Sequence, residues 1–129
     1  MKYKKSAEQN AIKRPPRHIL VFLYQNYIVD FRTGRIMSRI TKKLVGSKSN
    51  GCPINDGYRR IFARGFTLKY HHVSFFLHHK RWPRTQLDHK DGRKLNNAPW
   101  NLEEVTEEEN RRRKLERIRK LKAKNDKIV

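Results

Sequence analysis

The chain has 129 residues, enough for one domain with a small core. Lys and Arg total 32 against 12 Asp and Glu, and a formal net charge of +20 attracts polyanions such as nucleic acids. Cys52 is the single cysteine, which excludes an intramolecular disulfide and a zinc site of paired cysteines. The longest apolar run, residues 19–24, is far shorter than the about 20 residues of a membrane-spanning helix.

The first 17 residues are basic and polar and end in Pro15 and Pro16, which predicts a flexible basic arm over residues 1–17. No apolar stretch follows the basic start of the chain, so the sequence predicts no secretory signal and a cytoplasmic location. An amphipathic membrane anchor in the C-terminal tail is an alternative use of the charge, and we rank it below nucleic acid binding.

Residues 18–70 are predicted to form a short helix and two hairpins. The run at 19–24 has no clean period, so helix and strand are both open, and Pro16 just upstream favours a helix. Two hairpins are predicted after it, the first from strands at 27–29 and 31–37 and the second from strands at 58–63 and 66–70.

Two helices are predicted in the second half of the chain. Residues 71–79 carry apolar side chains too densely for a half-exposed strand, which favours a buried short helix. Another helix is predicted from Thr106, because Thr106 and Glu109 have the spacing of a capping box. Its apolar stripe consists of Leu115, Ile118 and Leu121. With a stripe this narrow, the helix either packs one face or frays towards its end.

The charge pattern inverts between residues 85 and 110. Seven of the 12 acidic residues fall in this window against three basic ones: Asp88, Asp91, Glu103, Glu104, Glu107, Glu108 and Glu109 against Lys90, Arg93 and Lys94. Carboxylates near a phosphate backbone weaken binding unless a cation lies between them, and a divalent metal is the usual cation. The window therefore predicts a metal site in a chain that binds nucleic acid.

The same window carries a series of short motifs. In chain order they are Asp88-His89, Asp91-Gly92, Asn96-Asn97, Asn101-Leu102, and Thr106 followed four residues later by Asn110. This series resembles the HNH endonucleases, and most of all their phage and intron-encoded homing branch. Residues 71–83 are similar to the helix that precedes the motif in that family, and residues 33–36 and 57–61 are similar to its amino-terminal strands. The resemblance therefore extends over about residues 27–115.

The resemblance implies an α+β fold, a small single domain with a ββα-metal nuclease core, amino-terminal β-hairpins and a basic carboxy-terminal helix. In that core, strands near 86–89 and 102–105 and a helix from residue 106 surround one metal ion. The expected divisions of the chain are the basic arm at 1–17, the amino-terminal strands and hairpins at 18–70, the nuclease core at 71–115 and a basic helical tail at 116–129.

The resemblance and side-chain chemistry together suggest four roles. His89, with an ordinary pKa of about 6.5, would take a proton from water as general base. Asn101 would hold the loop and orient the base through its amide, or else only cap a turn. Asp88, pointing to the other side of its strand from His89, and Asn110 would bind one Mg²⁺ or Mn²⁺ ion. Many relatives have a histidine at the position of Asn110, and the amide makes zinc or nickel a poorer fit.

Cations around the motif and the second hairpin are expected to contact DNA: Arg59, Arg60, Arg93, Lys94, Arg111, Arg112, Arg113 and Lys114. His71 and His72 could be packing residues or phosphate contacts. Asn96 and Asn97 are more simply turn formers.

The function expected from the sequence is hydrolysis of phosphodiester bonds in double-stranded DNA by a homing-type nuclease of a phage or mobile element, acting in the host cytoplasm. The alternative is a non-catalytic basic nucleic-acid-binding protein. Charge supports that alternative equally well, but it does not explain the acidic window. The target site, the number of strands cut and the oligomeric state stay open.

Overall fold

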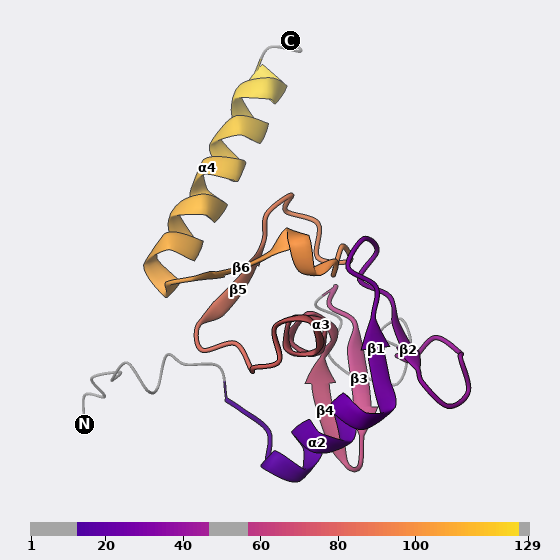
Figure 1. The fold of residues 1–129 in the computed structure, drawn as a ribbon. Helices are drawn as coiled ribbons and strands as arrows, with labels where there is room; N and C mark the ends of the chain where they lie inside the picture. The colour runs from indigo at the N-terminus through magenta and orange to yellow at the C-terminus, as the bar shows by residue number, and fades with distance from the viewer. Residues whose placement is uncertain (1–12, 47–56, 127–129) are drawn as a thin grey trace, which may run out of the picture.

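The computed structural model describes residues 13–46 and 57–126, and Figure 1 shows how their elements are arranged. The strands form three separate two-stranded antiparallel sheets, β1 with β2, β3 with β4, and β5 with β6. In chain order the elements are α2 (Arg17–Asn26), β1 (Tyr27–Val29), β2 (Ile36–Ser38), β3 (Arg60–Ala63), β4 (Phe66–Lys69), α3 (Tyr70–His79), β5 (Gln86–His89), the 3-10 turn η1 (Pro99–Asn101), β6 (Leu102–Val105) and α4 (Glu107–Asp126).

The α+β class is confirmed, and β5 and β6 have the bounds expected from the sequence. Most of the predicted arm, residues 1–12, lies outside the described residues, as does Cys52. Within the described part of the chain, no helix combines the length and the apolar character needed to cross a membrane.

Helix α2 forms as predicted, directly after the double proline. The backbone amides of Ile19 and Leu20 donate to the carbonyl of Pro16, whose ring fixes its φ in a range that suits a helix start. Ile19 and Leu23, one turn apart, are fully buried. The short apolar run is therefore the inner face of a helix and not a strand.

The first hairpin differs from the prediction in its second strand, which begins at Ile36 and not at Phe31. The reason is Asp30. Its side chain accepts a hydrogen bond from the amide of Arg32, and its carbonyl accepts one from the amide of Gly34. These bonds fold residues 30–35 into a compact loop, in which Gly34 has a φ of +73°.

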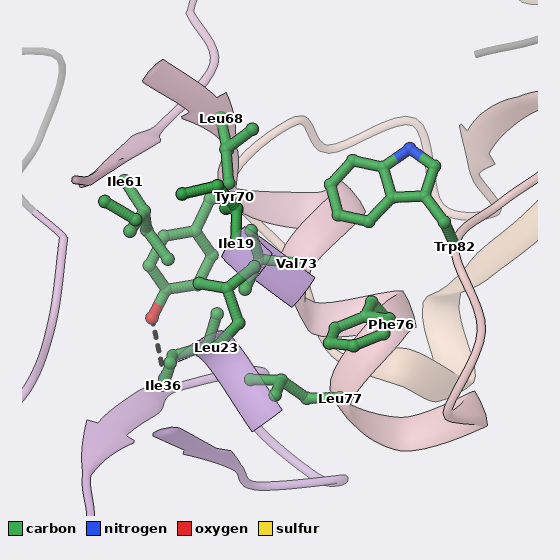
Figure 2. Close-up of a cluster of buried hydrophobic side chains, with 11 residues drawn as sticks. Ile19, Leu23, Ile36, Ile61, Leu68, Tyr70, Val73, Phe76, Leu77 and Trp82 are labelled. Carbon is green, nitrogen blue, oxygen red and sulfur yellow. Dashed lines mark hydrogen bonds between the residues drawn. The ribbon is translucent and has the colours of Figure 1, made fainter. Parts of the chain in front are cut away.

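Figure 2 shows the main core, where side chains from α2, β2 and the second hairpin meet α3. Tyr70, the first residue of α3, lies at its centre, and its hydroxyl oxygen accepts a 2.7 Å hydrogen bond from the amide of Ile36. Large apolar side chains contribute about 1.5–3 kcal/mol each when fully buried. The buried members are Ile19, Leu23, Ile36, Ile61, Ala63, Leu68, Tyr70, Val73, Phe76, Leu77 and Trp82.

Helix α3 is the buried short helix that the sequence predicts, starting one residue earlier. It ends at Lys80, whose left-handed backbone caps the helix by donating to the carbonyl of Phe76. On its other side, Phe75 joins Leu87 and Leu102 in a smaller cluster. Helix α3 thus carries the β5–β6 hairpin on the main core.

Helix α4 runs for 20 residues, about 30 Å, and extends away from the rest of the fold in Figure 1. The amide of Glu109 donates to the hydroxyl of Thr106, which is the N-cap half of the predicted capping box. The carboxylate of Glu109 pairs instead with Arg112 and Arg113. The apolar stripe neither packs nor frays. Leu115, Ile118 and Leu121 are 52, 59 and 62 % exposed, and the helix continues to Asp126.

Candidate active site

Strand β5 ends in the two residues predicted to be metal ligand and base. In the pairing with β6, Asp88 lies opposite Glu103 and His89 opposite Leu102. Both residues are 5 % exposed. Asp88 is bonded to arginines of α4, whereas the ring of His89 is bonded to the loop that follows β5. Neighbouring positions of the strand therefore have different partners, as strand alternation predicts.

The ring of His89 is fixed both in orientation and in tautomer. Its Nε2 lies 3.0 Å from Oδ1 of Asn97. Because an amide oxygen accepts hydrogen bonds and does not donate them, Nε2 carries the proton of the neutral ring. The ring of His71 packs edge-on against it at 4.9 Å, and Tyr58 stacks at 6.1 Å, both between centroids. Nδ1 is thus the atom of His89 that can accept a proton.

Burial lowers the pKa of His89 below its ordinary value of 6.5, and Arg117 adds to this effect. The hydrogen bond to Asn97 and the charges of Asp88 and Asp91 oppose it in part. The net direction leaves the imidazole uncharged near neutral pH, the state in which it can act as a base.

Two more histidines next to this ring are also held neutral. Burial and its neighbours His72 and His89 lower the pKa of His71 well below 6.5. Burial, followed by the charge of Lys69, lowers the pKa of His72 to about 3. His72 packs edge-on against Trp82. His71 therefore packs directly against the ring of His89, and His72 packs behind it, against His71 and Trp82.

Asn97 is held by two parts of the chain that are far away in sequence. Its carbonyl accepts a 2.6 Å hydrogen bond from the hydroxyl of Ser74 on α3. Its backbone also lies directly against Gly34, where an added Cβ would come within 2.2 Å of the Asn97 carbonyl carbon. The amide that is hydrogen-bonded to the ring of His89 is thus positioned by the first hairpin and by α3.

Asn101 holds the loop between β5 and η1 and does so from a fully buried position. Its Oδ1 accepts from the amide of Asp91 at 3.1 Å, and its Nδ2 donates to Oδ1 of Asp91 and to the carbonyl of Asn96, both at 2.9 Å. The predicted loop-holding contacts are present. The hydrogen bond to the ring of His89 comes from Asn97, so Asn101 acts on the base through the loop.

The carboxylate of Asp88 is paired with two arginines of α4. Arg113 donates to Oδ2 at 3.1 Å, and Arg117 donates to Oδ1 at 3.3 Å and to Oδ2 at 3.2 Å. Arg117 also donates to the carbonyl of His89 at 3.1 Å, and Arg113 to Glu103 at 2.8 Å. These contacts fix α4 against the end of β5.

Asn110 reaches the same pocket from the first turns of α4. Its Nδ2 donates to Oε1 of Gln86 at 2.7 Å, which leaves its own Oδ1 as an acceptor. Asp88, His89 and Asn110 together line a pocket of about 560 Å³. The base and both predicted metal ligands are therefore brought to one cavity.

The donor set fits a hard divalent cation, with one carboxylate and one amide oxygen on the wall of a single pocket. Within residues 13–46 and 57–126, no group of three or more His, Cys, Asp or Glu side chains could hold a metal on its own. Mg²⁺ needs no such group, because it keeps several waters and is completed by substrate phosphate oxygens. The arginine pairs on Asp88 compete with a cation there.

The cations predicted to contact DNA differ in how exposed they are in the structure. Arg111, Arg112 and Lys114 are exposed on α4, although Arg112 is ion-paired with Glu109. Arg93 is exposed after β5, and Lys94 extends over the ring of Tyr58. The remaining three offer less surface: Arg60 is buried, Arg59 half-buried and Arg113 turned inward to Asp88.

Sequence reasoning took Asn97 for a turn former and did not single out Arg117 or Tyr58. A signal existed for Arg117, which lies four residues after Arg113 and so on the same helix face. Asn97 had none, because adjacent asparagines are typical of turns whatever their side chains contact.

Comparison with known proteins places these residues in a family. A model of the HNH endonuclease family matches residues 69–112, which include the predicted base, both predicted metal ligands and both buried asparagines. The segment is an HNH endonuclease domain.

A solved structure described as "DNA binding and cleavage by the HNH homing endonuclease I-HmuI" is also similar to this chain, with 30% sequence identity and a TM-score of 0.54. The match covers 71% of this chain and 53% of I-HmuI, so it spans about half the length of that protein. No curated protein matches the sequence. The similarity extends the likeness beyond the HNH domain into the amino-terminal part of the chain.

Proposed function

We propose that this chain is a metal-dependent endonuclease that hydrolyses phosphodiester bonds of double-stranded DNA, with His89 as general base. The observation that carries the proposal is the 3.0 Å hydrogen bond from Nε2 of His89 to Oδ1 of Asn97. It leaves the lone pair on Nδ1, in a ring whose lowered pKa keeps it uncharged. A water molecule next to Nδ1 would lose its proton to that atom and attack the phosphorus.

Asp88 and Asn110 would hold one divalent ion, Mg²⁺ or Mn²⁺, through oxygens that line the same pocket as His89. When bound, the ion would offset the negative charge that develops on the phosphate and on the leaving 3′-oxygen. Asn97 keeps the base in the required tautomer, and Asn101 keeps the loop of Asn97 in place. The expected products have 5′-phosphate and 3′-hydroxyl ends.

DNA as the substrate is supported by the charge of +20 and by the exposed cations of α4 next to the pocket. I-HmuI, which is similar to this chain, is described as a homing endonuclease that binds and cleaves DNA. A homing-type role, with a gene carried by a phage or another mobile element, is part of this proposal.

Incubation with supercoiled plasmid tests the proposal. In Mg²⁺ or Mn²⁺ the wild-type protein should produce nicked or linear DNA, and EDTA or His89→Ala should abolish the product. His78→Ala, at an exposed position on α3, is the matched control and should keep activity. Cleavage by a clean His89→Ala preparation would reject His89 as the base.

One observation favours a second candidate, a DNA-binding protein without catalysis. Both carboxylate oxygens of Asp88 are already paired with arginines, an arrangement that needs no metal. Such a protein would bind plasmid without cutting it, and Asp88→Ala would not change its response to Mn²⁺. The nuclease proposal predicts the opposite, cleavage that depends on Mn²⁺ and is lost with Asp88→Ala.

A further inference from the structure

The side chain of Asp88 is buried and held from one side by α4. Arg113 and Arg117, one helical turn apart, donate between them to both of its oxygens at 3.1–3.3 Å. Cation binding at a carboxylate requires an oxygen with a free lone pair in an accessible direction. In this arrangement both guanidinium groups reach Asp88 from α4, and Arg117 also lines the pocket.

The charge of the pocket also opposes a cation. Its lining contains three cations, Lys94, Lys114 and Arg117, and a single acid, Asp88. A divalent ion that enters from water meets a positive local field on a chain that is strongly positive as a whole. A DNA phosphate in this pocket would reverse the local balance, because it both attracts the ion and pairs with the side chains that repel it.

The two arginines are not held equally. Arg113 has three acidic partners, since it also pairs with Glu103 at 2.8 Å and Glu109 at 3.1 Å. Arg117 has Asp88 as its acidic partner and is bonded otherwise to the carbonyl of His89. The side chain of Arg117 is 36% exposed, compared with 27% for Arg113. Moving away from its present position would therefore break one ion pair of Arg117 but three of Arg113.

We propose that Arg117 is a positioning residue that holds Asp88 in the DNA-free chain and moves to a DNA phosphate when substrate binds, so that the divalent ion and DNA bind Asp88's pocket cooperatively. Arg113 stays on Glu103 and Glu109 and keeps α4 in place. A guanidinium can exchange a carboxylate for a phosphate, because its planar fork can bind two oxygens of either group. The inference rests on the proposed function for the identity of the ion and of the polyanion.

Cooperativity of this kind is reciprocal. If DNA raises the affinity for the ion by some factor, the ion must raise the affinity for DNA by the same factor. The DNA-free protein would bind the ion poorly. Asp88 would become available to the ion mainly after a DNA phosphate has bound in the pocket. A free Arg117 would then also contact the backbone of the bound DNA.

The test is a Mn²⁺ titration in which free Mn²⁺ is measured by electron paramagnetic resonance, with and without a 30-base-pair duplex of mixed sequence. All proteins carry His89→Ala, so that the duplex stays intact, and a protein that also carries Asp88→Asn reports Mn²⁺ bound by DNA alone. We expect the duplex to tighten Asp88-dependent Mn²⁺ binding at least tenfold. Arg117→Gln should tighten binding without DNA several-fold and reduce the effect of the duplex.

Arg119→Gln is the matched control, because Arg119 is exposed on the same helix and takes no part in the pairs with Asp88. It removes the same charge and should leave DNA-free Mn²⁺ binding close to that of the parent protein. Equal Mn²⁺ affinity with and without the duplex would overturn the inference, as would an equal effect of Arg117→Gln and Arg119→Gln. Circular dichroism of each variant verifies that α4 is folded.

Failure of the inference and failure of the proposed function have different signatures. Plasmid cleavage by wild-type protein without Mn²⁺–DNA coupling would reject the role of Arg117 and leave the nuclease intact. Coupling without cleavage would support the exchange at Asp88 and reject catalysis. The absence of any Asp88-dependent Mn²⁺ binding, even with DNA and Arg117→Gln, would reject both the metal site and the inference.

Discussion

The amide oxygen of Asn97 lies 3.0 Å from Nε2 of His89, and both residues are buried. The bond selects the tautomer in which Nδ1 is basic, so it determines which atom of the ring can receive a proton. Asn97 owes its own position to Ser74 and Gly34, which belong to other elements.

Replacement of Asn97 should affect turnover more than binding. With Asn97→Ala, His89 can turn and change tautomer, and we expect kcat to fall by about 10- to 100-fold with a small change in KM. Leu95→Ala, at an exposed position of the same loop, is the control and should have near wild-type kcat. Plasmid-nicking kinetics measure both values. A variant with unchanged kcat would show that the tautomer is fixed by something else.

Gly34 and Gly65 form a matched pair for stability. Both have positive φ, so alanine at either position should cost about 1–3 kcal/mol through backbone strain. At Gly65 a new Cβ meets nothing within 4 Å, whereas at Gly34 it would lie 2.2 Å from the backbone of Asn97. Gly34→Ala should therefore be the more destabilising in urea denaturation. It should also lower nicking activity at permissive temperature, and Gly65→Ala should not.

The neutral histidine cluster predicts loss of stability in acid. His72 has an ordinary pKa of 6.5 when unfolded and a pKa of about 3 in the fold, so protons bind preferentially to the unfolded chain. The contribution of neutral His72 to the free energy of unfolding is fully present above pH 6.5, and it is lost as the pH falls from 6.5 towards about 3. Each unit by which the pH falls in that window should lower the free energy of unfolding by up to about 1.4 kcal/mol.

The measurement compares wild type with His72→Gln by urea denaturation at several pH values. The difference in unfolding free energy between the two proteins should shift in favour of the variant as the pH falls. A difference that is constant from pH 7 to 4 would contradict a half-buried, neutral His72.

Salt dependence of DNA binding should separate exposed from buried arginines. Each phosphate contact contributes about 0.9 to the slope of log K against log salt. Arg111→Ala removes a cation that is 72% exposed on α4, and it should reduce the slope by about that amount. Arg60→Ala removes a buried guanidinium and should leave the slope unchanged even if it lowers stability. Fluorescence anisotropy with a labelled duplex at several salt concentrations gives the slopes.

The parts of the fold that sequence reasoning obtained are those specified by short local patterns. The capping box at Thr106 places the start of α4, and β5 and β6 have the expected bounds. The largest departure among local elements is β2, which begins late because the side chain of Asp30 folds the loop before it. The sequence does not show that the side chain of this aspartate will hydrogen-bond the nearby backbone and form a loop in place of strand pairing. Strand β3 also begins later than predicted, at Arg60 and not at Tyr58.

The contacts within the site depend on packing between distant segments, and these were not accessible from the sequence. Asn97 is selected over Asn96 to face His89 by the hydrogen bond from Ser74, 23 residues away. Arg113 was expected to face DNA because it lies in a run of cations, but Asp88 and Glu103 draw it inward. Charge patterns predict that a helix is basic without predicting which cations its own fold will use.

The loop at residues 30–35 has a consequence for how this domain could be reused. Gly34 lies on the backbone of Asn97, and the indole of Trp100 donates to the carbonyl of Arg32. The loop around His89 is thus held by a hairpin that lies far upstream in the sequence, outside the segment 69–112 that matches the family model. Grafting the motif segment alone onto another protein would transfer the reactive histidine without the scaffold that orients it, so the portable unit is longer than the motif.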